Sequence, residues 1–197
     1  MEISPSRFIA IFTVLVAAFS FALLDAFSFL ALLLVCAAVT SLVCDRNESY
    51  ACRDNSIILG VFLIIEFLAF KFLIPLEPGA FPMIYLGAMV FGAQLIFCIA
   101  TFFTYMYRPI VSLKLTGRFQ MHYSDSILMW LFAYEGVVCL LALLENTLRN
   151  SSPELHNITF VYDNFELLTY LARAGMAGML FTMLVTSKNQ TVEREGV

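Results

Sequence analysis

The sequence predicts an all-α integral membrane protein, a polytopic bundle of six transmembrane helices, or five in the alternative reading, with no soluble domain. Of its 197 residues, 61% are apolar and 13% are charged, and the mean hydropathy is +0.87. A soluble domain is nearer half apolar and a quarter charged. The apolar residues also form runs that match a bilayer core of roughly 30 Å, which needs about 20 residues per helix. Residues 1–197 are therefore expected to form a single membrane domain.

The first apolar run extends from residue 8 to residue 43, and Asp25 is its only charged residue. A helix of about 36 residues would be about 54 Å long, which is too long for one ordinary span. We therefore expect two short spans, 8–24 and 26–43, with a turn at Asp25. No Gly or Pro marks that turn, so a single long helix that projects from the membrane is the alternative. That alternative reduces the count to five spans.

The remaining spans are bounded by helix-breaking or helix-capping residues, and they are expected at 57–76, 82–107, 127–148 and 160–185. Pro75 and Pro78 end the first of them. Pro109 is expected to close the second directly after Arg108. Ser124 offers an N-cap for the third. A long loop at 108–125 and a polar tail at 186–197 complete the chain.

Orientation follows from the Lys and Arg residues of the loops, which are retained on the cytoplasmic side. With six spans, one side receives only Arg149, and the other receives Arg7, Arg46, Arg53, Arg108, Lys114, Arg118, Lys188 and Arg194. This asymmetry predicts a multi-pass protein of the cell (inner) membrane with a cytoplasmic C-terminus. The N-terminus is cytoplasmic with six spans and outside with five.

Three ionisable residues lie near the middle of predicted spans: Glu66, Glu135 and Arg173. A charge at mid-bilayer costs roughly 2.5–3.5 kcal/mol on insertion scales, so Arg173 is expected to pair with Glu135 or Glu66. Lys71 lies closer to a span end, where its stem can reach the interface. The pairing has two interpretations, an ion pair that fixes helix packing and a polar pathway for an ion or proton. Residues near the outer interface are expected to be solvated: Glu145, Asp163 and Glu166.

Small residues are expected to let helices approach closely at two places, Gly87 with Gly92 and Gly175 with Gly178. These faces suit packing within one chain or between copies. A homo-oligomer is therefore among the expected assemblies.

The 108–125 loop carries basic and apolar residues, among them Arg108, Lys114, Leu115, Arg118, Phe119 and His122. Basic residues beside a membrane attract anionic lipid at about 1 kcal/mol each, so the loop is expected to lie on the membrane surface. The other interpretation is a docking site for a cytosolic protein.

Groups for catalysis are scarce in this sequence. His122 and His156 are predicted on opposite sides of the membrane, so one chain cannot form a histidine metal centre. Nucleophile-elbow, phosphate-loop and dinucleotide motifs are absent. We therefore expect no enzyme, no metal and no cofactor. A net charge of −4 also argues against a nucleic-acid partner. Cys44 and Cys52 flank one polar loop and can pair only in an oxidising compartment, whereas the charges place this loop inside.

The leading hypothesis is a non-catalytic membrane subunit that oligomerises and anchors or signals to a cytosolic protein at 108–125 and the C-terminal tail. In size and layout the chain resembles small membrane subunits of bacterial defence or immunity modules, which implies a sensor or scaffold. The alternative is a small oligomeric ion or proton channel or transporter that uses Glu66, Glu135 and Arg173.

Overall fold

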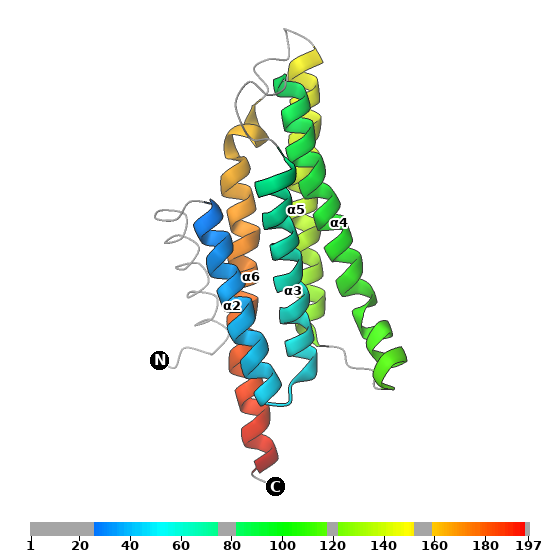
Figure 1. Cartoon of the computed structure of the whole chain (residues 1–197), viewed down its shortest axis with the longest axis vertical. Coiled ribbons are helices and arrows are strands. Elements are labelled where there is room, and N and C mark those ends of the chain that lie inside the picture. Colours follow the sequence, from blue (N-terminus) through cyan, green and yellow to red (C-terminus); the bar gives the residue numbers. More distant parts are fainter. Residues whose placement is uncertain (1–25, 75–81, 118–121, 152–158, 196–197) are drawn as a thin grey trace, which may run out of the picture.

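The computed structural model describes residues 26–74, 82–117, 122–151 and 159–195, and this part of the chain is a helical bundle without strands (Figure 1). Its elements are α2 (Ala26–Arg46), α3 (Tyr50–Leu68), the π-helical turn η1 (Ala69–Leu73), α4 (Met83–Thr116), α5 (Tyr123–Ser151) and α6 (Phe160–Glu195). Within the described ranges, five helices are long and apolar enough to cross a membrane. They support the predicted transmembrane bundle, while the span expected at 8–24 lies outside the described residues.

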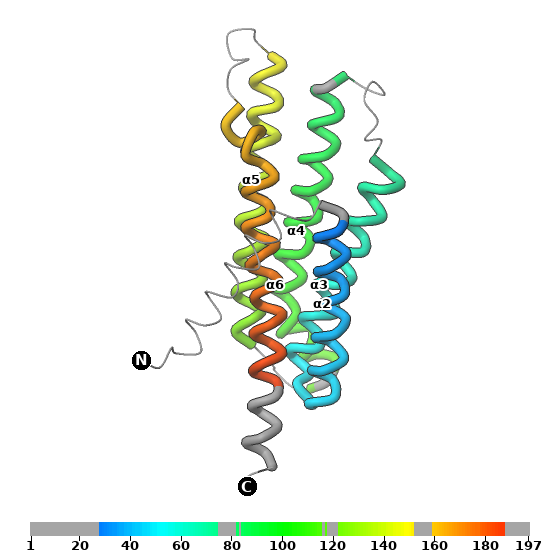
Figure 2. Tube along the Cα trace, turned by 90° about the vertical axis from the view of Figure 1, so that its left-hand side faces the viewer, coloured from blue at the N-terminus to red at the C-terminus, as the bar shows by residue number. Residues whose placement is uncertain are grey.

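The helices α2 and α3 form a tight hairpin. The backbone N–H of Ser49 donates to the carbonyl oxygen of Cys44 at 2.8 Å, and Glu48 between them adopts the left-handed region with φ 55°. Going round the bundle, α3 packs on α2, α2 on α6, α6 on α5 and α5 on α4 (Figure 1 and Figure 2). Contact between α3 and α4 is much sparser, so the ring of helices is loosest between these two.

Helix α4 is longer than the sequence predicts. The expectation that it ends before Pro109 is wrong, because the helix continues to Thr116 and is closed by Gly117 in the left-handed conformation, φ 69°. A proline is tolerated inside a membrane helix when neighbouring groups satisfy the freed backbone. The 108–125 loop is accordingly shorter than expected, since α5 already begins at Tyr123. Toward its C-terminal end, α4 diverges from α5 at the lower right of Figure 1.

Helix α6 begins at Phe160, as expected, but the surroundings of its first turn and the position of its C-terminal end differ from expectation. Its first turn is held by Glu145 of α5, whose carboxylate accepts hydrogen bonds from the backbone N–H groups of Val161 at 2.8 Å and Tyr162 at 3.4 Å. A carboxylate at a helix N-terminus is favoured by the helix dipole. The prediction that Glu145 is solvated is therefore wrong, and this residue is buried. At the other end, helix continues to Glu195, through most of the tail expected at 186–197.

The core is layered because α3 and α5 repeat the same spacing of buried residues. On each helix a polar residue is followed by two apolar ones and then by a glutamate eleven residues on: Asn55, Leu59, Leu63 and Glu66 on α3; Ser124, Leu128, Phe132 and Glu135 on α5. Steps of three and four residues keep one face of a helix. Two polar layers therefore lie about 16 Å apart, with an apolar layer between them.

Two of the four predicted packing glycines are in close contacts. A Cβ atom on Gly87 would lie 2.7 Å from the side chain of Asn146, and one on Gly175 would lie 2.8 Å from Leu131 Cδ2. Gly178 is buried on α6, whereas a Cβ on Gly92 would meet nothing within 4 Å. Close helix approach therefore depends on Gly87 and Gly175 and not on Gly92.

The pair Gly87 and Gly92 gives a matched test of this packing. Gly87→Ala is expected to lower the free energy of unfolding by about 1–3 kcal/mol, because the added methyl displaces a buried amide. That amide, Asn146, donates to the carbonyl oxygen of Ile84 at 3.0 Å. Gly92→Ala on the same helix is expected to be neutral or stabilising by up to about 1 kcal/mol, from helix propensity alone. Unfolding in detergent measures both, and equal stability of the two variants would contradict this packing.

Candidate functional site

Four side chains from four helices meet in the polar layer that contains the two glutamates; we call them the carboxylate cluster: Glu66, Gln94, Glu135 and Arg173. The Arg173 guanidinium donates through Nη2 to Glu66 Oε1 at 2.5 Å and through Nε to Glu135 Oε1 at 3.3 Å. The amide nitrogen of Gln94 donates to the same two oxygens, at 3.1 and 3.2 Å. The cluster thereby joins α3, α4, α5 and α6 at a single point.

The charges of the carboxylate cluster do not balance. Two carboxylates face one guanidinium, so with all three groups ionised the cluster carries one negative charge. Glu135 is only 1% exposed, and Glu66 and Gln94 are buried as well. An uncompensated charge is expensive in such surroundings. A proton or a small cation bound at the carboxylates would neutralise it.

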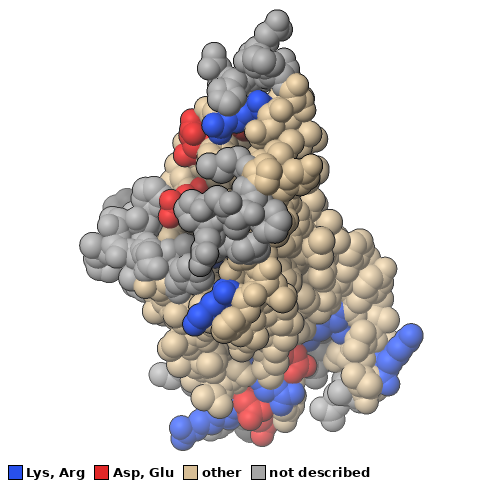
Figure 3. Space-filling model, turned by 45° about the horizontal axis from the view of Figure 1, so that its top comes forward, with Lys and Arg blue, Asp and Glu red and all other residues tan. Residues whose placement is uncertain are grey.

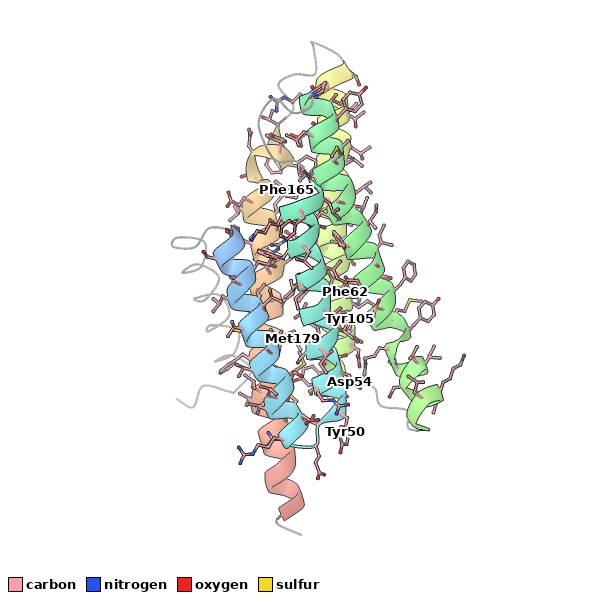
Figure 4. The ribbon with its side chains drawn as sticks, viewed as in Figure 1. Tyr50, Asp54, Phe62, Tyr105, Phe165 and Met179 are labelled. Atoms are coloured by element: carbon pink, nitrogen blue, oxygen red, sulfur yellow. The ribbon has the colours of Figure 1, made fainter. Side chains whose placement is uncertain are left out.

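A cavity of about 280 Å³ borders this cluster. Glu66, Gln94 and Arg173 form its polar wall, and most of the remaining lining is aromatic or aliphatic: Leu30, Phe67, Phe70, Val90, Phe165 and Tyr170. Thr169 and the exposed Glu166 line it nearer the start of α6. Phe165 marks its position in the upper half of the bundle in Figure 4. The cluster is thus open to a space large enough for several water molecules or a small solute.

The second polar layer is built around a buried ion pair between Arg108 and Asp125. Arg108 donates through Nε to Asp125 Oδ1 at 2.6 Å and through Nη2 to Oδ2 at 2.7 Å. Asp125 also accepts the backbone N–H of His122 at 2.8 Å, which fixes the start of α5. Beside this pair, Asn55 Nδ2 donates to Ser124 Oγ at 2.7 Å, and Tyr105 Oη donates to the carbonyl oxygen of Asn55 at 3.0 Å.

A wider hollow of about 610 Å³ borders this second layer, between α3 and α4. Arg108 and Asp54 contribute its charged groups, and Asp54 lies toward the lower end of the bundle in Figure 4. Between the two layers, Leu59, Leu63, Leu128 and Phe132 are all buried. Each polar layer therefore borders its own hollow, and apolar side chains separate the layers.

Of the intramembrane residues that the sequence singles out, three lie together in the carboxylate cluster and Lys71 lies apart. Arg173 pairs with both glutamates proposed for it, and Gln94 completes that cluster although the sequence analysis missed it. The sequence does single out this residue, because Gln94 is the only charged or amide side chain between residues 83 and 100. Lys71 does not belong to the cluster; its Nζ lies 5.4 Å from the ring centroid of Phe67.

The residues expected on the docking loop do not form one surface. Arg108 was expected there as an exposed basic group, and this is wrong, because it is 6% exposed and paired with Asp125. Lys114 and Leu115 are exposed near the end of α4. His122 is half-buried against Cys52, at 3.5 Å from its sulfur. Arg118 and Phe119 lie outside the described residues.

Among the described residues, no group of three His, Cys, Asp or Glu side chains is arranged to hold a metal ion. No protein-family model, curated protein or solved structure matches this chain.

Proposed function

We propose that this protein is a small membrane channel or transporter for protons or small cations, in which the carboxylate cluster is the ion-binding site. One observation carries the proposal: two carboxylates share a single guanidinium beside a cavity, so the cluster has one negative charge that is not balanced. An ion pair that served only to fix helix packing would need one carboxylate, whereas a second one adds a charge that binding a proton or cation removes. Ionisable residues inside a membrane commonly mark ion and proton pathways.

In this proposal, the described structure is the closed conformation of the channel or transporter. An ion reaches the carboxylate cluster through the cavity on one side, and the apolar layer at Leu59, Leu63, Leu128 and Phe132 stops it. Hydrophobic constrictions close channels by excluding water. Passage toward Arg108 and Asp125 then requires α3 and α4 to separate, and these neighbouring helices have the sparsest contact in the ring.

For the orientation, we propose that the end carrying Arg46, Arg53 and Lys114 faces the cytoplasm. Basic residues beside a span are retained on that side. Figure 3 shows Lys and Arg side chains gathered mainly toward this lower end, mixed with acidic ones. The carboxylate cluster then lies in the outer half of the membrane, and the Arg108–Asp125 pair in the inner half.

Ion flux from purified protein in liposomes tests the proposal. A trapped pH dye reports proton entry under a potassium diffusion potential, and sodium and potassium gradients are compared in parallel. Glu135→Gln is expected to reduce the flux at least about tenfold, because it removes the excess negative charge. Asp163→Asn removes the same charge at an exposed position on α6 and is expected to leave flux unchanged. Absence of flux in the unmodified protein under every gradient would refute the proposal.

A second candidate function, a membrane subunit that anchors a cytosolic protein, is favoured by the free end of α4. The C-terminal end of α4 diverges from the bundle (Figure 1). Apolar residues near this end are exposed close to Lys114: Ile110, Val111, Leu113 and Leu115, the last 80% exposed. Exposed apolar patches on one element mark interaction surfaces. In this candidate the carboxylate cluster only fixes the helices, and the chain acts as a scaffold or sensor, as in a bacterial defence module. A homo-oligomer is compatible with both candidates, and the open face at Gly92 would allow a second copy to approach closely.

Co-purification in mild detergent, with native mass determination, tests this second candidate. A stoichiometric soluble protein is expected to accompany the unmodified chain and to be lost when Lys114 and Arg118 are both changed to Glu. Arg149→Glu, a charge reversal at the opposite end of the bundle, is the control and is expected to retain the partner. Recruitment that survives the double reversal would count against docking at this end of α4.

A further inference from the structure

Two cysteines and a histidine meet at the hairpin end of the bundle, away from the carboxylate cluster. Cys44 lies in the last turn of α2 and Cys52 in the first turn of α3, and their thiols are close enough to interact with each other. Cys52 Sγ lies 3.5 Å from His122 Nε2 and 3.8 Å from Nδ1. His122 Nδ1 is in turn 2.8 Å from Ser124 Oγ, which orients the ring. Both thiols are free.

The fold contains a second thiol pair that lacks these surroundings. Cys98 on α4 and Cys139 on α5 are also close enough to interact with each other, and both are buried and free. No histidine is in hydrogen-bonding contact with either of them among the described residues. A thiol that reacts as a nucleophile must give up its proton, and a neighbouring imidazole can take it. The two pairs therefore share burial and differ in the presence of a base.

We propose that Cys44 and Cys52 form a redox-sensitive thiol pair that a peroxide oxidises to a disulfide, with His122 as the base. This inference is independent of the proposed transport function. In the proposed orientation the pair lies at the cytoplasmic end, where thiols are kept reduced. The reduced pair is then the resting form, and peroxide is the signal that changes it.

The chemistry balances in two steps. Cys52 Sγ passes its proton to the unprotonated nitrogen of the His122 ring and attacks one oxygen of hydrogen peroxide. The O–O bond breaks, a Cys52 sulfenic acid forms, and the released hydroxide takes the proton back as water. Cys44 Sγ then attacks Cys52 Sγ, which forms the S–S bond and breaks the S–OH bond. The departing hydroxide and the Cys44 proton make a second water. The thiols lose two electrons and two protons in all, and the peroxide is reduced.

The positions of the two cysteines favour this closure. They face each other across the turn at 47–49, so a bond between them joins the ends of one short hairpin. Cys44 is 0% and Cys52 1% exposed, which excludes bulky reagents. Hydrogen peroxide is much smaller, so a slight local opening would admit it. Closing the disulfide removes the thiol proton that Cys52 can share with His122, and so weakens one link between α3 and the start of α5.

Two variants of the full-length chain, each keeping two of the five cysteines, separate the two pairs in membrane vesicles. One retains Cys44 and Cys52 in a Cys36→Ala, Cys98→Ala, Cys139→Ala background; the other retains Cys98 and Cys139 with the remaining three replaced by Ala. After hydrogen peroxide, free thiols are blocked with N-ethylmaleimide in denaturant and the protein is digested with trypsin. Cleavage after Arg46 and Arg53 places Cys52 alone in the 47–53 peptide, so a Cys44–Cys52 disulfide appears as two joined peptides.

The first variant is expected to give the joined peptides, minus two hydrogens, at a peroxide dose that leaves Cys98 and Cys139 reduced. Adding His122→Asn to it is expected to slow the reaction about tenfold or more, since it removes the base. His122→Gln repeats the test, and size-exclusion profiles verify that the variants fold. Equal oxidation of the two pairs, an unchanged rate in both histidine variants, or oxidation of Cys52 without joining to Cys44 would each overturn the proposal.

Discussion

Arg173→Met is expected to lower the free energy of unfolding by about 3–5 kcal/mol, because it leaves two buried carboxylates without their shared cation. Arg173 donates to both Glu66 and Glu135, and Glu135 is 1% exposed. Gln94, which donates to the same two oxygens, cannot replace the charge. Chemical or thermal unfolding in detergent measures the change.

A compensated variant separates the charge effect from the loss of the side chain. Combining Arg173→Met with Glu66→Gln and Glu135→Gln removes every charge of the cluster, and neutral replacement of a buried ionic group is often tolerated. This triple variant is expected to recover most of the stability. If the free energy of unfolding of Arg173→Met equals that of the unmodified protein, the guanidinium does not balance the two glutamates.

Arg108→Met is the second substitution with a large expected effect, a loss of about 3–5 kcal/mol. Its partner Asp125 is buried and is held by two hydrogen bonds of 2.6 and 2.7 Å from the guanidinium. Arg108→Lys keeps the charge but not the two-pronged geometry, so its loss is expected to be intermediate. The same detergent unfolding assay ranks these variants.

Lys114→Met provides the control on the same helix. Lys114 is exposed near the end of α4, and exposed positions usually change stability by no more than about 0.5 kcal/mol. If Arg108→Met were as mild as Lys114→Met, Arg108 would belong to an exposed basic segment, as the sequence alone suggests.

The sequence predicts the parts of this fold that depend on local properties. Long apolar runs place five helices close to where they lie. The cost of a mid-membrane charge predicts that Arg173 pairs with Glu135 or Glu66, and it pairs with both. Their shared depth could be predicted because each lies near the middle of its own span. The expected first span at 8–24 stays a prediction.

The remainder depends on tertiary contacts that no local pattern contains. Pro109 reads as a helix end, yet Arg108 is fixed by Asp125, seventeen residues later, and the helix continues past the proline. A basic residue beside a proline also reads as a surface loop, so the sequence alone suggests an exposed Arg108 and misses its buried ion pair with Asp125. Gln94 was overlooked because a single amide in an apolar run acquires meaning only when α3, α5 and α6 bring two carboxylates to it.

Proton flux through the charge-neutral triple variant, Glu66→Gln, Glu135→Gln and Arg173→Met, distinguishes most directly between a conduction site and a structural ion pair. The variant is reconstituted in liposomes beside the unmodified protein, at matched protein content and with its folding verified by size exclusion. If the carboxylate cluster binds the transported ion, the unmodified protein conducts and the folded triple variant does not. If the folded triple variant conducts as well as the unmodified protein, the cluster only fixes the helices and ions pass elsewhere.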